Sequence, residues 1–330
     1  MLAGIPGWDV LAAALLAGVL LDALLGEVSR FHPLVGFGRL ASAIEKRINR
    51  RPPAAGMIAP AAPVAGIARG ALGWALAVLP PVALLAWVCA LPLPPTALVV
   101  LHAVLLYFCL GLRSLRDHML PIAHALQAGD LAGARKLTAR IVSRDTQQAS
   151  EPELAKAATE SMLENGNDAV FGTLFWFAIA GGPGALLFRL ANTLDAMWGY
   201  RTERFNLFGR CAARIDDALN FLPARLTAIT YALLAPGSGG TRRALACWRM
   251  QAPAWSSPNA GPVMSSGAGA LGLQLGGAAS YGGKTEARPP LGEGAAAAAA
   301  DVPRAWRLVR NSTCLWLAAM LCIAYGARHA

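Results

Sequence analysis

The sequence predicts an all-α integral membrane protein with about four spanning helices, a broken re-entrant hairpin, and helices and loops on the cytoplasmic face. Hydrophobic residues make up 55% of the 330 residues, charged residues only 15%, and the mean hydropathy is +0.45. Such a composition is typical of a chain that lies largely in lipid. Several apolar runs approach the ~20 residues that cross the hydrocarbon core, and Lys and Arg gather between them, as they do in cytoplasmic loops.

The first apolar run, Val10 to Leu25, predicts a retained spanning helix. No Lys or Arg precedes it, so it lacks the positive region of a signal peptide, and Asp22 is expected near one interface. The segment from Val28 to Arg69 follows and is expected in the cytoplasm, because it has seven basic residues against Glu45 and the preceding Glu27. Its basic residues are Arg30, Arg39, Lys46, Arg47, Arg50, Arg51 and Arg69.

Three more runs complete the predicted spans. Gly70 to Leu91 and Thr96 to Leu112 predict a helical hairpin whose outer turn is Pro92 to Pro95, with a kink at Pro80-Pro81. Cys314 to Gly326 forms the last span. Four crossings place both termini on the exterior face and the polar segment 113–168 in the cytoplasm.

The run from Ala169 to Ala191 predicts a re-entrant hairpin, because Gly181-Gly182-Pro183-Gly184 divides it. The halves have about 12 and 7 residues, and 12 helical residues cover only ~18 Å. Broken backbone is tolerated at membrane depth where protein or a cavity surrounds it. The alternative is an ordinary bent spanning helix. Leu226 to Ala235, after Pro223, predicts a short buried or interfacial helix.

The expected domain organisation is simple. Residues 1–285 form a single membrane-embedded domain, and residues 301–330 form a C-terminal membrane helix that packs on it. Between them, residues 286–300 are rich in alanine and predict a low-complexity linker with no chemistry of its own.

Net charge and metal motifs exclude several classes of protein. The net charge is +10, but no basic stretch carries the aromatic residues or zinc spacing of nucleic-acid modules, so no nucleic-acid partner is expected. No pair of the six cysteines has CxxC spacing, and the five histidines form no HExxH. Neither a disulfide framework nor a metal held only by protein side chains is indicated.

An acidic helix is predicted from Glu151, with Pro152 in its first turn and a stop at Asn165-Gly166. Glu160 and Glu164 are four residues apart on one face, where like charges repel unless a cation lies between them. A magnesium ion or the basic group of a substrate would remove that repulsion. The alternative is a solvated face with Lys156 and Arg144 nearby.

A second polar cluster lies between Asn192 and Leu226. Carboxylates and amides that converge with arginines at a membrane surface suit a magnesium-polyphosphate ligand; structural ion pairs are the alternative. The cluster contains Asp195, Arg201, Arg204, Asp216, Asp217, Asn220 and Arg225.

A third, glycine-rich segment runs from Ser257 to Gly283. Glycine lets backbone N–H groups approach an anion closely, so this segment could hold phosphate or a large planar ligand. It matches neither a Walker A loop nor GxGxxG. A packed loop or a close helix contact is the alternative.

Five blocks in order carry a resemblance to a known family. They are LDALLGEVSRFHPLVGFGRL (21–40), SRDT (143–146), ATESMLENGNDAVFGTLFW (158–176), the run from NTLDAMWGYR (192–201) to FGRCAARIDDALNFLPARLT (208–227), and SPNAGPVMSSGAGALGLQLGG (257–277) with YGG (281–283). The chain resembles the adenosylcobinamide-phosphate synthase family of cobalamin biosynthesis, the CobD/CbiB type. Val28 and Thr173 stand where many relatives are expected to have proline.

The resemblance implies a multi-pass enzyme of the inner (cytoplasmic) membrane, with its active site on the cytoplasmic face. It would join adenosylcobyric acid to (R)-1-amino-2-propanol phosphate, or to aminopropanol, by an amide bond. ATP and Mg²⁺ are the implied cofactors, and the corrinoid is a substrate. The implied partners are these substrates and the lipid bilayer; a homo-oligomer or a complex with other cobalamin-assembly enzymes is compatible with it.

Candidate site residues follow from the three clusters and the proposed reaction. Asp195 or His32 is the candidate base, with Glu164 and Asp217 as further catalytic candidates. Metal candidates are Glu160, Glu164, Asp168, Asp216 and Asp217. Substrate-binding candidates are Asn165, Arg201, Arg214, Asn220, Arg225, Ser257, Asn259 and Tyr281.

Two other functions are compatible with part of the pattern. A transporter could use the broken apolar segment as a discontinuous helix, but no internal repeat is visible and the polar motifs lie in large loops. A scaffold for corrinoid enzymes would not need so many carboxylates beside arginines.

Overall fold

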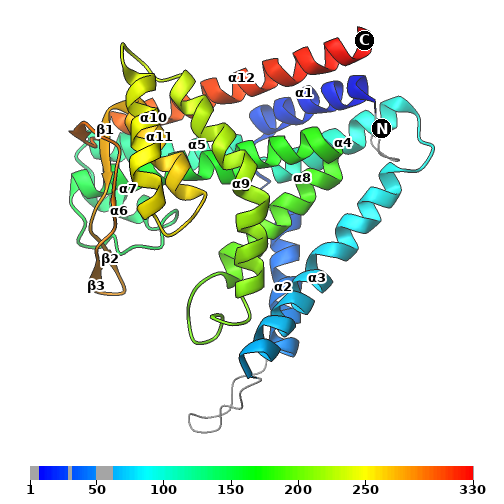
Figure 1. The fold of residues 1–330 in the computed structure, drawn as a ribbon, viewed down its shortest axis with the longest axis horizontal. Helices are drawn as coiled ribbons and strands as arrows, with labels where there is room; N and C mark the ends of the chain where they lie inside the picture. Colours follow the sequence, from blue (N-terminus) through cyan, green and yellow to red (C-terminus); the bar gives the residue numbers. More distant parts are fainter. Residues whose placement is uncertain (1–6, 29–31, 50–61, 330) are drawn as a thin grey trace. The chain divides into compact units, whose positions relative to one another are not determined.

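A computed structural model describes residues 7–28, 32–49 and 62–329 and is mostly helical (Figure 1). Three of the predicted basic residues, Arg30, Arg50 and Arg51, lie outside the described residues. The chain divides into two compact units, which are described separately. Unit 1 comprises residues 1–110, 172–219 and 320–330, and unit 2 comprises residues 111–171 and 220–319.

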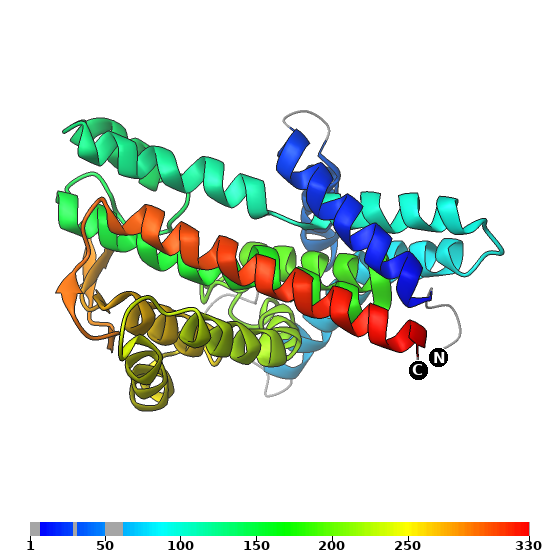
Figure 2. The same ribbon diagram turned by 90° about the horizontal axis from the view of Figure 1, so that it is seen from above.

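Unit 1 is built from helices. They are α1 (Trp8–Leu25), α2 (Pro33–Ile48), α3 (Ala62–Cys89), α4 (Pro95–Cys109) and α8 (Gly172–Trp198), with the first part of α9 (Arg210–Leu233) and the end of α12 (Asp301–His329). Helix α1 packs along α4 (Figure 2). Gly18 permits this approach, since a Cβ there would lie 2.9 Å from the Leu106 side chain. Small residues at such contacts let membrane helices pack closely.

Within residues 7–28, 32–49 and 62–329, five helical stretches are long and apolar enough to cross a membrane. Four of them overlap the four predicted spanning runs, and the fifth contains the run with the Gly-Pro break. The number of crossings stays a prediction. The stretches are Trp8–Leu25, Val64–Cys89, Pro95–Gln127, Glu151–Trp198 and Asp301–Ala327.

Helix α8 breaks at the position that the sequence predicts. Ala180 has φ −136° and ψ 18°, and Gly181 has φ 62° and ψ −151°. The chain then doubles back, because a Cβ on Gly172 would lie 2.1 Å from the Phe188 ring, whereas residues 16 apart in a straight helix are ~24 Å apart. The N–H of Gly182, at the start of the second half, donates to His102 Nδ1 at 2.8 Å. A re-entrant position of this hairpin in a bilayer stays a prediction.

Unit 2 holds the remaining helices and five short strands. The helices are α5 (Leu112–Gln127), α6 (Leu131–Thr138), α7 (Glu151–Asn165), the π-helix η1 (Gly166–Phe171), α10 (Gly240–Gln251), the 3-10 helix η2 (Ala252–Ala254) and α11 (Ala260–Leu271), with most of α9 and α12. Helix α11 packs on α7 and α10, and α5 packs on α6 and α7.

Helix α7 begins as predicted and ends differently. A capping box between Ser150 and Glu153 starts it, with Pro152 in the first turn. The α-helix ends at Asn165, but the chain continues as a π-helix instead of stopping. Gly166 serves packing here, since a Cβ would lie 2.4 Å from the Tyr231 hydroxyl.

Three prolines expected to end or bend helices lie inside long ones. Helix α9 starts at Arg210 and contains Pro223, so the expected start after that proline is wrong. Helix α3 likewise contains Pro80 and Pro81.

The strands depart from the all-α expectation and involve the predicted linker. Strand β1 (Leu273–Gly276) pairs antiparallel with β4 (Pro290–Leu291) and parallel with β5 (Ala295–Ala296). Strands β2 (Ala279–Tyr281) and β3 (Lys284–Glu286) form a hairpin. Residues 286–300 therefore contain paired strands. Small residues allow close backbone packing: Gly292 has φ +74°, and a Cβ on it would lie 2.2 Å from the Leu273 carbonyl.

A basic cleft and a candidate active site

The predicted site residues divide between the two units. Unit 1 contains His32, Asp195, Arg201, Arg214, Asp216 and Asp217. Unit 2 contains Glu160, Glu164, Asn165, Asp168, Asn220, Arg225, Ser257, Asn259 and Tyr281. Within each unit the structure brings several of these side chains together. That all of them share one site stays a prediction.

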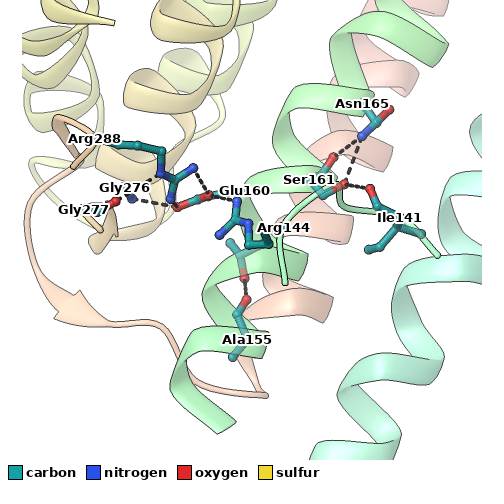
Figure 3. A network of polar contacts seen from close by, with 10 residues as sticks. Ile141, Arg144, Ala155, Glu160, Ser161, Asn165, Gly276, Gly277 and Arg288 are labelled. Carbon is teal, nitrogen blue, oxygen red and sulfur yellow. Dashed lines mark hydrogen bonds and ion pairs between the residues drawn. The ribbon is translucent and has the colours of Figure 1, made fainter. Parts of the chain in front are cut away.

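Glu160 in unit 2 is the centre of a buried polar network (Figure 3). Its carboxylate is 2% exposed and lies 2.5 Å from Arg144 Nη2 and 3.2 Å from Arg288 Nη1, both measured to Oε2. Oε1 accepts hydrogen bonds from Arg288 Nη2 at 3.3 Å and from the Gly276 N–H at 2.7 Å. Two guanidinium groups thus share one carboxylate. Arg144 and Arg288 place positive charge beside Glu160; a magnesium ion at this position stays a prediction.

A cleft of ≈ 670 Å³ lies beside this network and has three walls. Arg144 and the loop that follows it, residues 145–149, form the first wall. Glu153, Lys156 and Ala157 on α7 form the second, and residues 278–280, 282 and 283 of the β2–β3 hairpin form the third. This volume lies in the range of small-molecule sites.

Asp145 fixes the hairpin against the loop. Its N–H donates to the Ser280 carbonyl at 2.8 Å, and its Oδ2 accepts from the Gly283 N–H at 2.7 Å. The SRDT and YGG blocks of the sequence, 138 residues apart at this contact, therefore meet at one cleft. A smaller hollow of ≈ 290 Å³, lined in part by Gly276 and Gly277, shares Glu153 and Lys156 with it.

Three predicted substrate-binding residues are connected at the start of α11. Arg225 Nη1 donates to Asn259 Oδ1 at 2.9 Å, and Nη2 donates to the Pro258 carbonyl at 3.1 Å. Ser257 Oγ accepts from the N–H groups of Asn259 and Ala260 at 3.3 and 3.1 Å. These contacts hold the amide of Asn259 in one orientation.

Buried amides form another connected group in unit 2. Asn167 Nδ2 donates to Asn220 Oδ1 at 2.8 Å and to Asp168 Oδ1 at 3.0 Å, and Thr227 Oγ1 donates to Asn167 Oδ1 at 3.0 Å. Two residues before Asn167, Asn165 Nδ2 donates to the Ser161 carbonyl at 2.9 Å. Asn220 and Asp168 are thus joined through Asn167, which the sequence did not single out.

The acidic site candidates of unit 1 lie on two helices: Asp195 on α8, and Asp216 and Asp217 on α9. Asn192 Nδ2 donates to Asp216 Oδ1 at 3.4 Å, and Asp217 is close enough to Asp195 for their charges to interact. Burial raises the pKa of Asp217, and Arg214 partly opposes this rise. Burial raises a carboxyl pKa because it disfavours the charged form.

His32 caps the N-terminus of α2, where its Nδ1 accepts from the Leu34 N–H at 3.2 Å. Burial lowers the pKa of His32, and Glu27 partly opposes this while Arg189 adds to it. A neutral imidazole is the form that can accept a proton. Arg201, by contrast, is exposed.

No group of three or more His, Cys, Asp or Glu side chains among residues 7–28, 32–49 and 62–329 is placed to hold a metal ion alone. Magnesium usually needs only one or two carboxylates when phosphates supply further oxygens. Asp216 and Asp217, adjacent on α9, are two carboxylates of this kind. Glu160 already contacts two guanidinium groups. It therefore suits a role in orienting Arg144 and Arg288 better than a role as a metal ligand.

Several residues of the cleft and its network are not apparent as site candidates from the sequence. Arg288 lies in the alanine-rich segment that predicted a linker, and Asp145 stands out only within the SRDT block. The sequence pattern was also compatible with Lys156 on a solvated helix face, so it did not mark this residue as a site candidate. The SRDT block is the sequence feature that could have identified Arg144 and Asp145 as site residues. No feature of the sequence identifies Arg288.

Comparison with known proteins decides the family. The model of the family described as CobD/Cbib protein matches residues 15–309. The chain belongs to the CobD/Cbib family. Its match includes Arg144, Glu160 and Arg288, which form the buried network.

Curated relatives in this family match over nearly their full length. A cobalamin biosynthesis protein CobD of Stutzerimonas stutzeri is 55% identical, over 93% of this chain and 96% of the relative. One of Chromobacterium violaceum is 52% identical, over 94% and 97%, and one of Mycobacterium tuberculosis is 38% identical, over 92% of each. No solved structure matches the chain.

Proposed function

We propose that the chain is a cobalamin-biosynthetic enzyme that joins adenosylcobyric acid to (R)-1-amino-2-propanol phosphate, or to aminopropanol, by an amide bond. The observation that carries this proposal is the CobD/Cbib match over residues 15–309. The relatives named cobalamin biosynthesis protein CobD support the pathway, because the chain spans 96% and 97% of the first two described above. The amide-forming step is the family's activity implied by the sequence blocks.

The reaction requires activation of a carboxylate, which is a poor electrophile in water. ATP would supply the γ-phosphoryl group, with Mg²⁺ offsetting its charge. An acyl phosphate and ADP result. The amine nitrogen then attacks the carbonyl carbon, the C–N bond forms, the C–O bond to phosphate breaks, and inorganic phosphate leaves. The attacking ammonium first gives up a proton to a base.

The acidic group of unit 1 suits the base and the metal. The raised pKa of Asp217 makes it a stronger base than an ordinary aspartate, and Asp195 lies within range of its charge. Asp216, together with phosphate oxygens, would hold Mg²⁺, and Arg214 would pair with phosphate. His32, neutral because its pKa is lowered, is the alternative base.

The polar groups of unit 2 suit recognition of substrates. The corrin periphery is rich in amides, and the orientations of Asn220 and Asn259 are fixed by hydrogen bonds. Asn165, Arg225, Ser257 and Tyr281 remain substrate-binding proposals, as does Arg201 in unit 1; Glu164 and Asp168 remain catalytic or metal proposals. The active site is proposed on the cytoplasmic face of the inner membrane, with the hairpin of α8 re-entrant.

The direct test is condensation by the purified full chain in detergent. Adenosylcobyric acid, aminopropanol phosphate, Mg²⁺ and ATP are supplied, and the corrinoid product is followed by mass spectrometry. Asp217→Asn is expected to lower the rate by roughly 10²–10⁴-fold if it removes the general base. Asp117→Asn, at an exposed residue of α5, is the matched control and should retain the rate. Absence of product with either amine from folded wild-type protein would contradict the proposal.

A further inference from the structure

The network around Glu160 carries an imbalance of charge. Arg144 and Arg288 are both mostly buried, at 13% and 15% exposure, and they share the single carboxylate of Glu160. Taken alone these three groups have a formal charge of +1. Lys156, which lines both neighbouring hollows, adds a second positive charge. Glu164 lies within electrostatic range of the network, and Asp145 and Glu153 also line the cleft. The backbone N–H groups of Gly283 and Ser150 donate to these last two carboxylates, so Arg144 and Lys156 are the groups that can meet an anion.

The two arginines have different roles in the network. Arg288 is turned inward: two of its nitrogens contact Glu160, and its Nε donates to the Gly277 carbonyl at 3.1 Å. Arg144 contacts Glu160 through Nη2 and also lines the cleft. A guanidinium carries five N–H donors. Glu160 thus fixes the orientation of a guanidinium that belongs to a residue lining the cleft.

The third wall of the cleft includes a glycine turn. Gly282 and Gly283 adopt φ +55° and +74°, and a Cβ on either would meet nothing within 4 Å. The turn therefore requires glycine for its backbone conformation and leaves open space beside it. Asp145 and Glu153 also line the cleft, so a cation can be accommodated together with an anion.

We propose that this cleft is the subsite for a phosphoryl group, with Arg144 and Lys156 as binding residues and Glu160 as a positioning residue. The inference rests on the proposed function and deepens it. The ligand is a phosphate ester whose charge is partly balanced by a cation, either the polyphosphate of ATP with Mg²⁺ or the phosphate of an amino alcohol with its ammonium. Both ligands present the same phosphoryl chemistry to Arg144.

Binding to the full chain in detergent tests the subsite without relying on turnover. Inorganic pyrophosphate with Mg²⁺ is the first probe, measured by calorimetry. Arg144→Ala and Lys156→Ala should each weaken its binding at least tenfold. Arg242→Ala, which removes an exposed arginine of α10 in the same unit, should leave binding unchanged. Lys156 does not contact Glu160 in the network, so its variant avoids disturbing the buried ion pairs.

Glu160→Gln separates positioning from simple electrostatics. The substitution removes a negative charge, so a purely electrostatic role would tighten pyrophosphate binding. A positioning role predicts at least threefold weaker binding, since Arg144 loses its charged partner, with little loss in Glu160→Asp. Tighter binding in Glu160→Gln would overturn the positioning role.

Competition then distinguishes the two sources of phosphate. Displacement of pyrophosphate by ATP, and not by aminopropanol phosphate, assigns the subsite to the nucleotide; the reverse result assigns it to the amine substrate. Unchanged pyrophosphate binding in folded Arg144→Ala and Lys156→Ala would overturn the subsite. If these variants also condensed the substrates with unaltered KM, the result would support the proposed function and contradict the phosphoryl subsite. Pyrophosphate binding at the cleft without condensation by the wild type would instead support the subsite and contradict the proposed function.

Discussion

Arg288 and Glu160 are 128 residues apart in the sequence, yet their side chains meet through two contacts of 3.2 and 3.3 Å. Each guanidinium nitrogen faces a different carboxylate oxygen, as in a bidentate pair. Arg288 thereby ties the alanine-rich segment after β3 to the middle of α7.

Arg288→Met is expected to lower the stability of the detergent-solubilised protein by about 1–3 kcal/mol. Loss of one partner of a buried ion pair leaves charge uncompensated, but Arg144 still contacts Glu160, which limits the loss. Chemical denaturation followed by tryptophan fluorescence measures it. In a Glu160→Met background the same substitution should cost much less. Equal costs in both backgrounds would show that the pair has no energetic coupling.

Gly172→Ala tests the reversal of α8. A Cβ at residue 172 would lie 2.1 Å from the Phe188 ring, and overpacking of this kind costs roughly 1–3 kcal/mol. Phe188→Leu in the same chain should recover part of the stability by removing the ring. If α8 were instead a straight span, the two residues would not touch, and Phe188→Leu would give no rescue.

Gly181→Ala is expected to destabilise the protein for two reasons. The φ of +62° costs a side-chain-bearing residue roughly 1–2 kcal/mol, and the added Cβ would lie 2.6 Å from the His102 ring. Gly36→Ala on α2 is the matched control, since nothing lies within 4 Å of its Cβ, and it should be neutral or slightly stabilising. Similar melting temperatures for both variants would contradict the strained turn.

The hydrogen bonds of Glu45 predict that unit 1 becomes less stable in acid. Burial acts to raise the pKa of Glu45, but hydrogen bonds from Arg204 and Asn49 outweigh it, so the pKa lies below its ordinary 4.5. The folded state therefore binds this proton less readily than the unfolded state. The contribution of ionised Glu45 to the free energy of unfolding is fully present above about pH 4.5. It is lost as the pH falls through the lower pKa of the folded state.

Glu45→Gln should remove this part of the pH dependence. Thermal unfolding between about pH 3 and 6 measures the effect in detergent, a range that brackets the carboxyl titration. Below pH 4.5, the ordinary pKa of a glutamate, the melting temperature of the wild type is expected to fall more steeply than that of the variant. Parallel profiles would show that Glu45 does not contribute to the acid response.

The long apolar helices and the break at Gly181 were predictable because both are local properties of the chain. Hydropathy identifies an apolar helix wherever about 20 residues must cross lipid, and a Gly-Gly-Pro-Gly run interrupts any helix. Pro223 shows the limit of local rules, since α9 continues through it. The sequence also predicted Arg225, Ser257 and Asn259 as site residues, and the structure connects them.

The cleft was harder to predict because long-range contacts create it. Asp145 meets the β2–β3 hairpin through backbone and carboxylate contacts that no local pattern encodes. Arg288 lies in a segment whose alanines and glycines suggested a linker, although close backbone packing around Gly292 explains that composition. Low complexity in the sequence here reflects tight packing in the fold.

The most direct test of the proposed chemistry follows oxygen from the carboxylate. Adenosylcobyric acid labelled with ¹⁸O in the reacting carboxylate is condensed with aminopropanol phosphate in the presence of ATP and Mg²⁺, and phosphate and nucleotide are analysed by mass spectrometry. Activation as an acyl phosphate predicts one ¹⁸O in inorganic phosphate for each amide formed. Label in AMP, or amide formation with no label in any phosphate, would contradict it.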